Sequence, residues 1–195
     1  MTRRRVLQAA VAVVLVAVGG WAVSRALDRL TGVQPVAPPA AAAPASPPAA
    51  GVAHITATLY YGSSDGQLLV PVRREVPFAD GVVPQGREIL SAQLQSPPEG
   101  QISVIPDGTA LRAFYITERG DAFVDVSGDI AARHPGGSTT ELLTVYAIVH
   151  AVTSNLPSIR RVQILVDGRE ADTLAGHVDL RRPLAPDPAL VRDPQ

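Results

Sequence analysis

Hydrophobic and polar residues alternate along five short stretches of the chain, a pattern typical of strands with one buried face. The first two stretches flank residues 62–66, a run of Gly, Ser and Asp that predicts a hairpin turn. Pro71 lacks the N–H that a sheet ladder needs, so the second stretch is expected at a sheet edge. The alternating stretches are residues 54–61, 68–76, 111–117, 121–126 and 161–166, and a further extended segment is predicted over 171–180.

Two segments show a helical period instead. Apolar side chains recur every three or four positions between Leu142 and Leu156, which predicts a helix over residues 138–155 with a single apolar stripe. Ser138 and Glu141 fit a capping box, in which Ser138 accepts from the third amide and Glu141 reaches back to the cap. A shorter helix is predicted over residues 87–95.

The predicted order of elements is strand, strand, helix, strand, strand, helix, strand, strand. Hairpins separated by helices favour an α+β fold, with an open, mostly antiparallel sheet and both helices on one face. We expect this domain to occupy residues 54–187, followed by a tail over 188–195.

The N-terminal end has a different pattern. Three Arg residues at 3–5 precede residues 6–24, which carry no charge and would form a helix of about 28 Å, enough to cross a bilayer core of about 30 Å. Because Arg residues remain cytoplasmic, residues 1–5 are predicted inside, and the domain outside, on the periplasmic or cell-wall side. The membrane is thus an expected partner through a single-pass helix. Residues 22–24 also fit a cleavage site and residues 2–7 a twin-arginine signal, and both alternatives deliver the domain to the same side.

Composition narrows the classes of function. Residues 25–53 are rich in Pro and Ala and are expected to form a semi-rigid linker. The chain contains no Cys, which excludes disulfides, a thiolate nucleophile and a lipidated cysteine. Residues 54–187 carry 11 Arg against 16 Asp and Glu. Such an acidic domain gains no affinity from the counterions that a phosphate polymer releases on binding, so nucleic acid is not an expected partner.

Few residues suggest chemistry. His177 and Asp179 would share one face of a strand, but no nucleophile motif accompanies them. Asp125 and Asp129 could act as paired carboxylates, although helix capping and turn formation explain them more simply. The histidines lack metal-ligand spacing, and no phosphate-binding loop or dinucleotide fingerprint occurs, so we expect no catalytic residue, no metal and no cofactor. Gly136 and Gly137 precede a helix and could bind an anion or simply provide a flexible entry.

The succession of motifs resembles the GerMN family, the sporulation and spore germination domain. The likeness covers about 130 residues, and the order and spacing of its five segments are more specific than any segment alone. These segments are residues 58–61 (TLYY) with 69–72 (LVPV) and Arg74, 105–109 (IPDGT), 122–127 (AFVDVS), 136–138 (GGS) with the following helix, and 162–168 (VQILVDG) with 176–180 (GHVDL).

The resemblance implies an α+β domain similar to ring-building modules of envelope complexes, in a protein that is not an enzyme. We therefore expect a scaffold or interaction module linked to cell-wall remodelling or sporulation-type complexes, which binds envelope proteins or itself. The alternatives are a peptidoglycan-binding or other glycan-binding domain and a wall hydrolase dependent on His177, Asp179 or Asp125. The expected contact residues for a ligand or partner are Tyr60, Tyr115, Asp125, Gly136, Gly137, Ser138, Gly176, His177 and Asp179.

Overall fold

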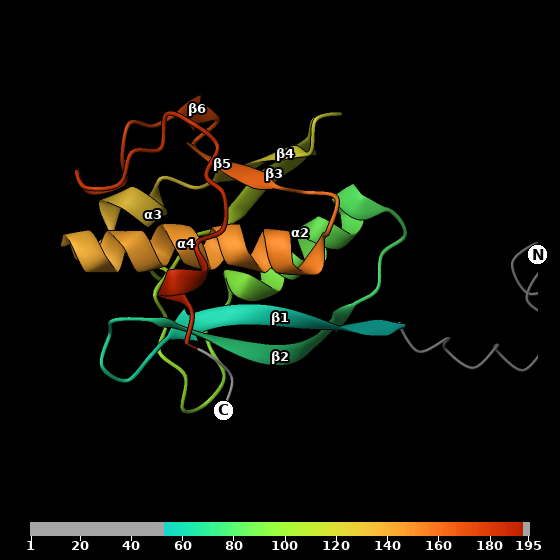
Figure 1. Cartoon of the computed structure of the whole chain (residues 1–195), viewed down its shortest axis with the longest axis horizontal. Coiled ribbons are helices and arrows are strands. Elements are labelled where there is room, and N and C mark those ends of the chain that lie inside the picture. Colours follow the sequence, from blue (N-terminus) through green and yellow to red (C-terminus); the bar gives the residue numbers. More distant parts are fainter. Residues whose placement is uncertain (1–52, 193–195) are drawn as a thin grey trace, which may run out of the picture. The chain divides into compact units, whose positions relative to one another are not determined.

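The computed structural model describes residues 53–192 of the 195-residue chain (Figure 1). Both the predicted membrane segment at 6–24 and almost all of the linker at 25–53 lie outside the described residues. Within the described part, no helix has the length and apolar character that crossing a bilayer requires.

The first sheet is a two-stranded antiparallel hairpin. Strand β1 covers His54–Gly62 and β2 covers Leu69–Pro77, in a register that runs from His54 opposite Pro77 to Gly62 opposite Leu69. The alternation in the sequence predicted this hairpin, and the structure confirms it.

The second sheet has four strands in the order β3-β4-β5-β6. Strands β4 and β5 are parallel, and the other neighbours are antiparallel. The α+β class is therefore confirmed, with the strands divided between two sheets rather than gathered in one open sheet. The strands are β3 (Leu111–Ile116), β4 (Asp121–Val126), β5 (Arg161–Val166) and β6 (Arg169–Glu170).

The prediction of an extended segment over residues 171–180 is wrong. Only Arg169–Glu170 pairs with β5, and the residues that follow form bends and irregular structure. Two backbone amides of this segment bond to a side chain of another element instead of a neighbouring strand, as described below.

The helices are α2 (Val82–Gln93), α3 (Asp129–Ala132), α4 (Ser138–Asn155) and the 3₁₀ turn η1 (Pro188–Leu190). Helix α4 has the predicted bounds. Helix α2 begins five residues before the predicted start, because Pro84 falls in its first turn, where the missing N–H has no helical partner in any case.

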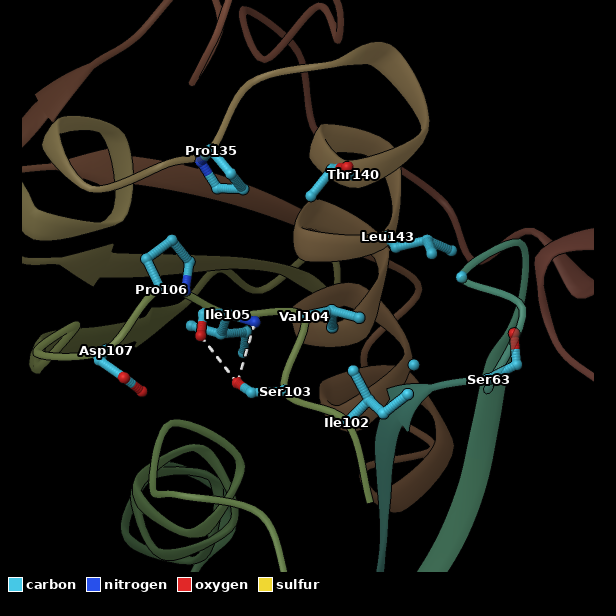
Figure 2. Close-up of a pocket in the computed structure, with 12 residues that line it drawn as sticks. Ser63, Ile102, Ser103, Val104, Ile105, Pro106, Asp107, Pro135, Thr140 and Leu143 are labelled. Carbon is cyan, nitrogen blue, oxygen red and sulfur yellow. Dashed lines mark hydrogen bonds between the residues drawn. The ribbon is translucent and has the colours of Figure 1, made fainter. Parts of the chain in front are cut away.

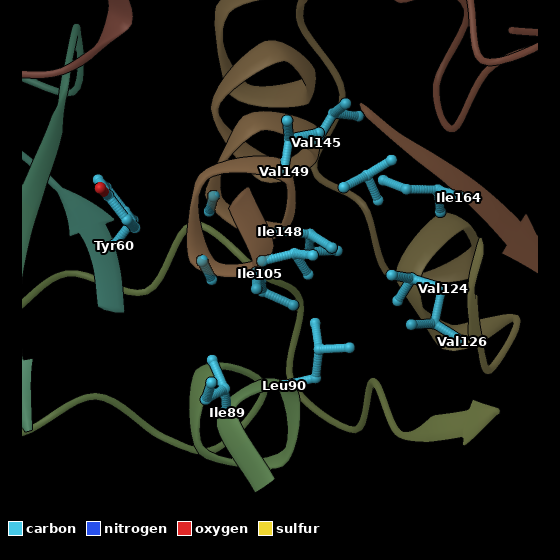
Figure 3. Close-up of a cluster of buried hydrophobic side chains, with 14 of the residues drawn as sticks. Tyr60, Ile89, Leu90, Ile105, Val124, Val126, Val145, Ile148, Val149 and Ile164 are labelled. Carbon is cyan, nitrogen blue, oxygen red and sulfur yellow. The ribbon is translucent and has the colours of Figure 1, made fainter. Parts of the chain in front are cut away.

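Helices α2 and α4 lie between the two sheets (Figure 1). Helix α4 contacts both β1 and β5, so it is buried on several sides and its expected single apolar stripe is wrong. Figure 3 shows the resulting core, in which Ile89 and Leu90 of α2 approach Ile148 of α4 and the side chains of the second sheet.

Candidate functional site

The capping box predicted at the start of α4 is absent, and Glu141 has another role. Gly137 occupies the cap position with φ 90°, and no side chain caps the helix. The Glu141 carboxylate is fully buried and accepts hydrogen bonds from the backbone amides of Leu174 and His177, both at 2.8 Å. Burial raises the pKa of this carboxyl, but the backbone hydrogen bonds outweigh burial and leave its pKa below the usual value.

The expected pairing of His177 with Asp179 on one strand face is wrong, because no strand covers residues 176–179 and the chain bends over residues 174–178. His177 Nδ1 lies 3.1 Å from Glu141 Oε2. Asp179 instead accepts two hydrogen bonds from the Arg181 side chain, at 2.9 and 2.8 Å. Gly176 adopts φ 97°, and its amide donates to the Thr173 hydroxyl. The segment is therefore a bend held by its own contacts and by Glu141.

Asp125 and Asp129 each have separate structural partners. Asp125 is only 6% exposed and accepts from the Gly168 amide at 2.8 Å and from Arg112 Nε at 3.3 Å. Asp129 pairs with Arg133 at 3.1 Å across one turn of α3. Asp125 thus holds the turn after β5, and it does not present a carboxylate to solvent as a surface contact would.

The two predicted aromatic contacts differ in exposure. Tyr60 is buried, and its hydroxyl lies 2.7 Å from Ser154 Oγ of α4, so its ring does not form an exposed surface contact. Its ring faces the core because helix α4 covers this side of β1. Tyr115 of β3 is 58% exposed and remains available to a partner.

Gly136, Gly137 and Ser138 do not line the nearby cavity of about 340 Å³ (Figure 2). Pro135 and Thr140 line the side of the cavity next to these residues. Gly136 and Gly137 have positive φ, of 86° and 90°, and give the chain its sharp entry into α4. The lining of this cavity includes Asp107 and no basic residue. Anion binding by the amides of Gly136 and Gly137 stays a prediction.

Two side-chain amides, which the sequence patterns did not point to, close the free edge of β1. Asn155 accepts from the Thr58 amide at 2.8 Å and donates to the Thr58 carbonyl at 2.7 Å. Gln93 does the same for Tyr60, with both bonds at 2.8 Å. Each carboxamide thus takes the place of a neighbouring strand. The only sequence signal is an amide residue near the C-terminal end of each helix, which is too common to be diagnostic.

The outer edge of β2 is partly closed as well. Because Tyr60 turns its backbone groups away from β2, its partner Pro71 also faces outward, and Pro71 has no N–H to offer. The Leu69 carbonyl accepts from the Arg192 amide at 2.8 Å. The edge position expected for Pro71 is therefore confirmed. This edge is only partly closed, because Arg73 and Glu75 also face outward and have no backbone hydrogen-bond partner among the described residues.

Strand β3, unlike β2, contains no Pro and, within the described part of the chain, has no hydrogen bond to the C-terminal segment. The Thr117 amide bonds to the Asp121 carbonyl at 2.8 Å, so by alternation Phe114 and Ile116 turn their backbone groups away from β4. Among residues 53–192 these groups have no recorded hydrogen-bond partner. Tyr115 projects beside this open edge.

Two further observations concern chemistry within the described residues. No group of three or more His, Cys, Asp or Glu side chains there is arranged to hold a metal ion. Every buried side-chain nitrogen and oxygen there has a hydrogen-bond partner. Ligand binding is therefore not needed to satisfy a buried side chain.

Comparison with known proteins supports the motif resemblance. A crystal structure of a candidate lipoprotein from Clostridium perfringens is similar, with 27% identity and a TM-score of 0.50 over 68% of this chain and 87% of that one. The tandem GerMN domains of the sporulation protein GerM from Bacillus subtilis share the fold, with 18% identity and a TM-score of 0.50 over 69% of this chain and 46% of that one. No curated protein gave a significant match.

The match to a family model is decisive. The model described as "Germane: Sporulation and spore germination" matches residues 58–172, more than half of the chain. The matched region includes both sheets, helices α2 and α4 and the open edge of β3. The chain therefore belongs to the Germane family of sporulation and spore germination domains.

Proposed function

We propose that this protein is a non-catalytic interaction module of the cell envelope, which binds a partner protein by pairing a strand with the open edge of β3. The single observation that carries this proposal is the difference between the edges: β1 is closed by Asn155 and Gln93, whereas Phe114 and Ile116 face outward unpaired among the described residues. An exposed edge strand is a ready template for pairing.

The location follows from the sequence and from one relative. We propose that residues 6–24 anchor the chain and that the domain lies outside the cytoplasm. The relative from Clostridium perfringens is described as a candidate lipoprotein, and such proteins are attached to membranes. GerM has two GerMN domains in tandem, whereas the family match covers one region of this chain, so a role specific to sporulation stays a prediction.

The absence of catalysis is supported by the contacts of the candidate residues. Asp125 holds Gly168 and Arg112, His177 contacts buried Glu141, and Asp179 is paired with Arg181. None of the three forms a nucleophile and base pair within the described residues. Incubation of the full chain with purified cell-wall sacculi should release no soluble fragments. Release that is lost in Asp125→Ala or His177→Ala would instead establish a hydrolase.

Photo-cross-linking in living cells tests the edge directly. A photoreactive phenylalanine analogue in place of Tyr115 should capture a discrete partner, and the same analogue in place of exposed Arg73 on β2 should not. Capture at both positions, or at neither, would contradict the proposal.

A pair of variants separates strand pairing from side-chain contact. Ile116→Pro removes an outward N–H without removing a bond to β4, and Ile116→Ala shortens the side chain but keeps the N–H. Capture at position 115 should fall in the proline variant and persist in the alanine variant. Equal capture by both would mean that the partner does not extend the sheet.

A further inference from the structure

A second cavity, of about 420 Å³, lies between β1, the C-terminal half of α4 and the segment over residues 186–192. Its volume falls within the range of about 300–1,000 Å³ typical of small-ligand sites. It is separate from the open edge of β3 and from the cavity beside Gly136, so it stands apart from the proposed function.

The charges around this cavity are unusual for an acidic domain. Arg160 and Arg192 line it, and none of its lining residues is acidic. Arg192 is partly occupied, because its Nη2 lies 3.0 Å from Asp65 Oδ2. Arg160 makes no salt bridge with any described residue, while its backbone is fixed by a 2.9 Å hydrogen bond to the Gly120 carbonyl. The guanidinium of Arg160 is thus a cation without an ion-pair partner among the described residues.

A hydroxyl pair adds a directed donor. The 2.7 Å bond between Tyr60 Oη and Ser154 Oγ uses one hydroxyl hydrogen and leaves the hydrogen of the other group free to donate. His150 adds no further cation: its Nε2 lies 3.0 Å from the Asp187 carbonyl, which can only accept, and burial lowers the pKa of its imidazole. The polar groups of the cavity therefore favour a ligand that accepts hydrogen bonds and carries negative charge.

The remaining walls are apolar. Ile159, Val191 and two prolines, Pro186 and Pro188, line the cavity. The wall formed by residues 186–192 is held in place by the hydrogen bond from His150 and by the bridge between Val191 and Leu69. A ligand with a charged end and a short apolar body would fit both parts of the lining.

We propose that this cavity binds the carboxylate of a small ligand with a short apolar body, such as a peptide C-terminus, with Arg160 holding the carboxylate. A guanidinium can form two parallel hydrogen bonds to a carboxylate, and the free hydroxyl of the Tyr60–Ser154 pair would donate a third. Wall stem peptides and ordinary protein C-termini share this chemistry.

Titration of the full chain with acetyl-D-alanyl-D-alanine, monitored by calorimetry at constant ionic strength, tests the inference. The free acid should bind at least about 10-fold more tightly than its C-terminal amide, a difference of about 1.4 kcal/mol. Comparison with the L,L peptide identifies the source: preference for the D,D form indicates wall peptides, and equal affinity indicates C-termini in general.

Matched variants assign the effect to the cavity. Arg160→Gln should weaken binding of the acid about 10-fold or more, and Arg160→Lys should retain part of the affinity. Arg87→Gln, at an exposed position of α2, should leave the affinity unchanged. Circular dichroism confirms that each variant is folded. Three outcomes would each overturn the inference. The acid and the amide could bind equally, or Arg160→Gln and Arg87→Gln could have equal effects. The chain could also bind inorganic phosphate but not the peptide.

Discussion

The two sheets of this domain differ in how many outward backbone groups of their edge strands are hydrogen-bonded. In the hairpin of β1 and β2, side-chain amides close the edge of β1, and Pro71 and the C-terminal segment cover part of the edge of β2. In the sheet of β3 to β6, helix α2 packs against Phe114, yet the outward backbone groups of β3 have no recorded partner among the described residues. Proteins commonly protect edges that have no function, because an unpaired edge promotes aggregation. The contrast with β1 therefore favours β3 as an edge left for a partner.

Removal of the Gln93 amide is the most direct way to break this contrast. Gln93→Ala should lower the free energy of unfolding by about 3 kcal/mol, since the buried N–H and C=O of Tyr60 both lose their partner. Urea denaturation measures the loss. The opened edge should also cause self-association, visible by size-exclusion chromatography. Gln67→Ala, at an exposed position, serves as the control and should change stability by less than about 0.5 kcal/mol.

A substitution at Gly86 tests the sheet of β3 to β6, because Gly86 lets α2 lie against β3. A Cβ at this position would overlap the buried Phe114 ring. Gly86→Ala should therefore destabilise the domain by about 2 kcal/mol. Helix propensity alone predicts the opposite sign, a gain of up to about 1 kcal/mol. Thermal unfolding distinguishes the two, and adding Phe114→Leu should recover part of the loss.

The Glu141 carboxylate of helix α4 holds the segment after β6 through hydrogen bonds to its backbone. Glu141→Gln should cost about 1.5 kcal/mol at pH 7, because its charge-assisted hydrogen bonds to two backbone amides weaken. The carboxyl has a lowered pKa in the fold, so its stabilisation is complete above the ordinary value of 4.5 and is lost as the pH falls below it.

Urea titrations from pH 7 to pH 3 check this dependence. The wild type should lose stability below pH 4.5 more steeply than Glu141→Gln. Glu118→Gln, in the exposed turn between β3 and β4, should follow the wild-type curve. Parallel curves for the wild type and Glu141→Gln would show that the buried carboxylate is not the source of the acid sensitivity.

The smallest expected change in stability is at the open edge itself. Tyr115→Ser should alter the free energy of unfolding by less than about 0.5 kcal/mol, because the side chain is 58% exposed. Partner capture from a photoreactive residue placed elsewhere on β3 should nevertheless decrease. A stability loss above 1 kcal/mol would mean that Tyr115 serves the fold rather than a partner.

The elements of the fold were largely predictable from the sequence. The hairpins and helix α4 follow from local alternation, turn residues and helical period, each of which acts over a few neighbouring positions. Helix α2 was placed too late because Pro84 and Gly86 weaken its pattern, although Pro is tolerated in a first turn. The segment at 171–180 was misassigned because its backbone bonds to Glu141 are not visible in its own sequence.

The candidate site was only partly predictable. Tyr115 is an exposed aromatic as expected, whereas Tyr60 and Asp125 are buried by elements that lie far from them in the chain. The sequence by itself determined the α+β class, the hairpins and the family. The tertiary structure alone decided which edge is closed, because the closing bonds join residues 97 and 33 positions apart, Thr58 with Asn155 and Tyr60 with Gln93. Such contacts depend on how helices pack over a strand, and no local pattern encodes that packing.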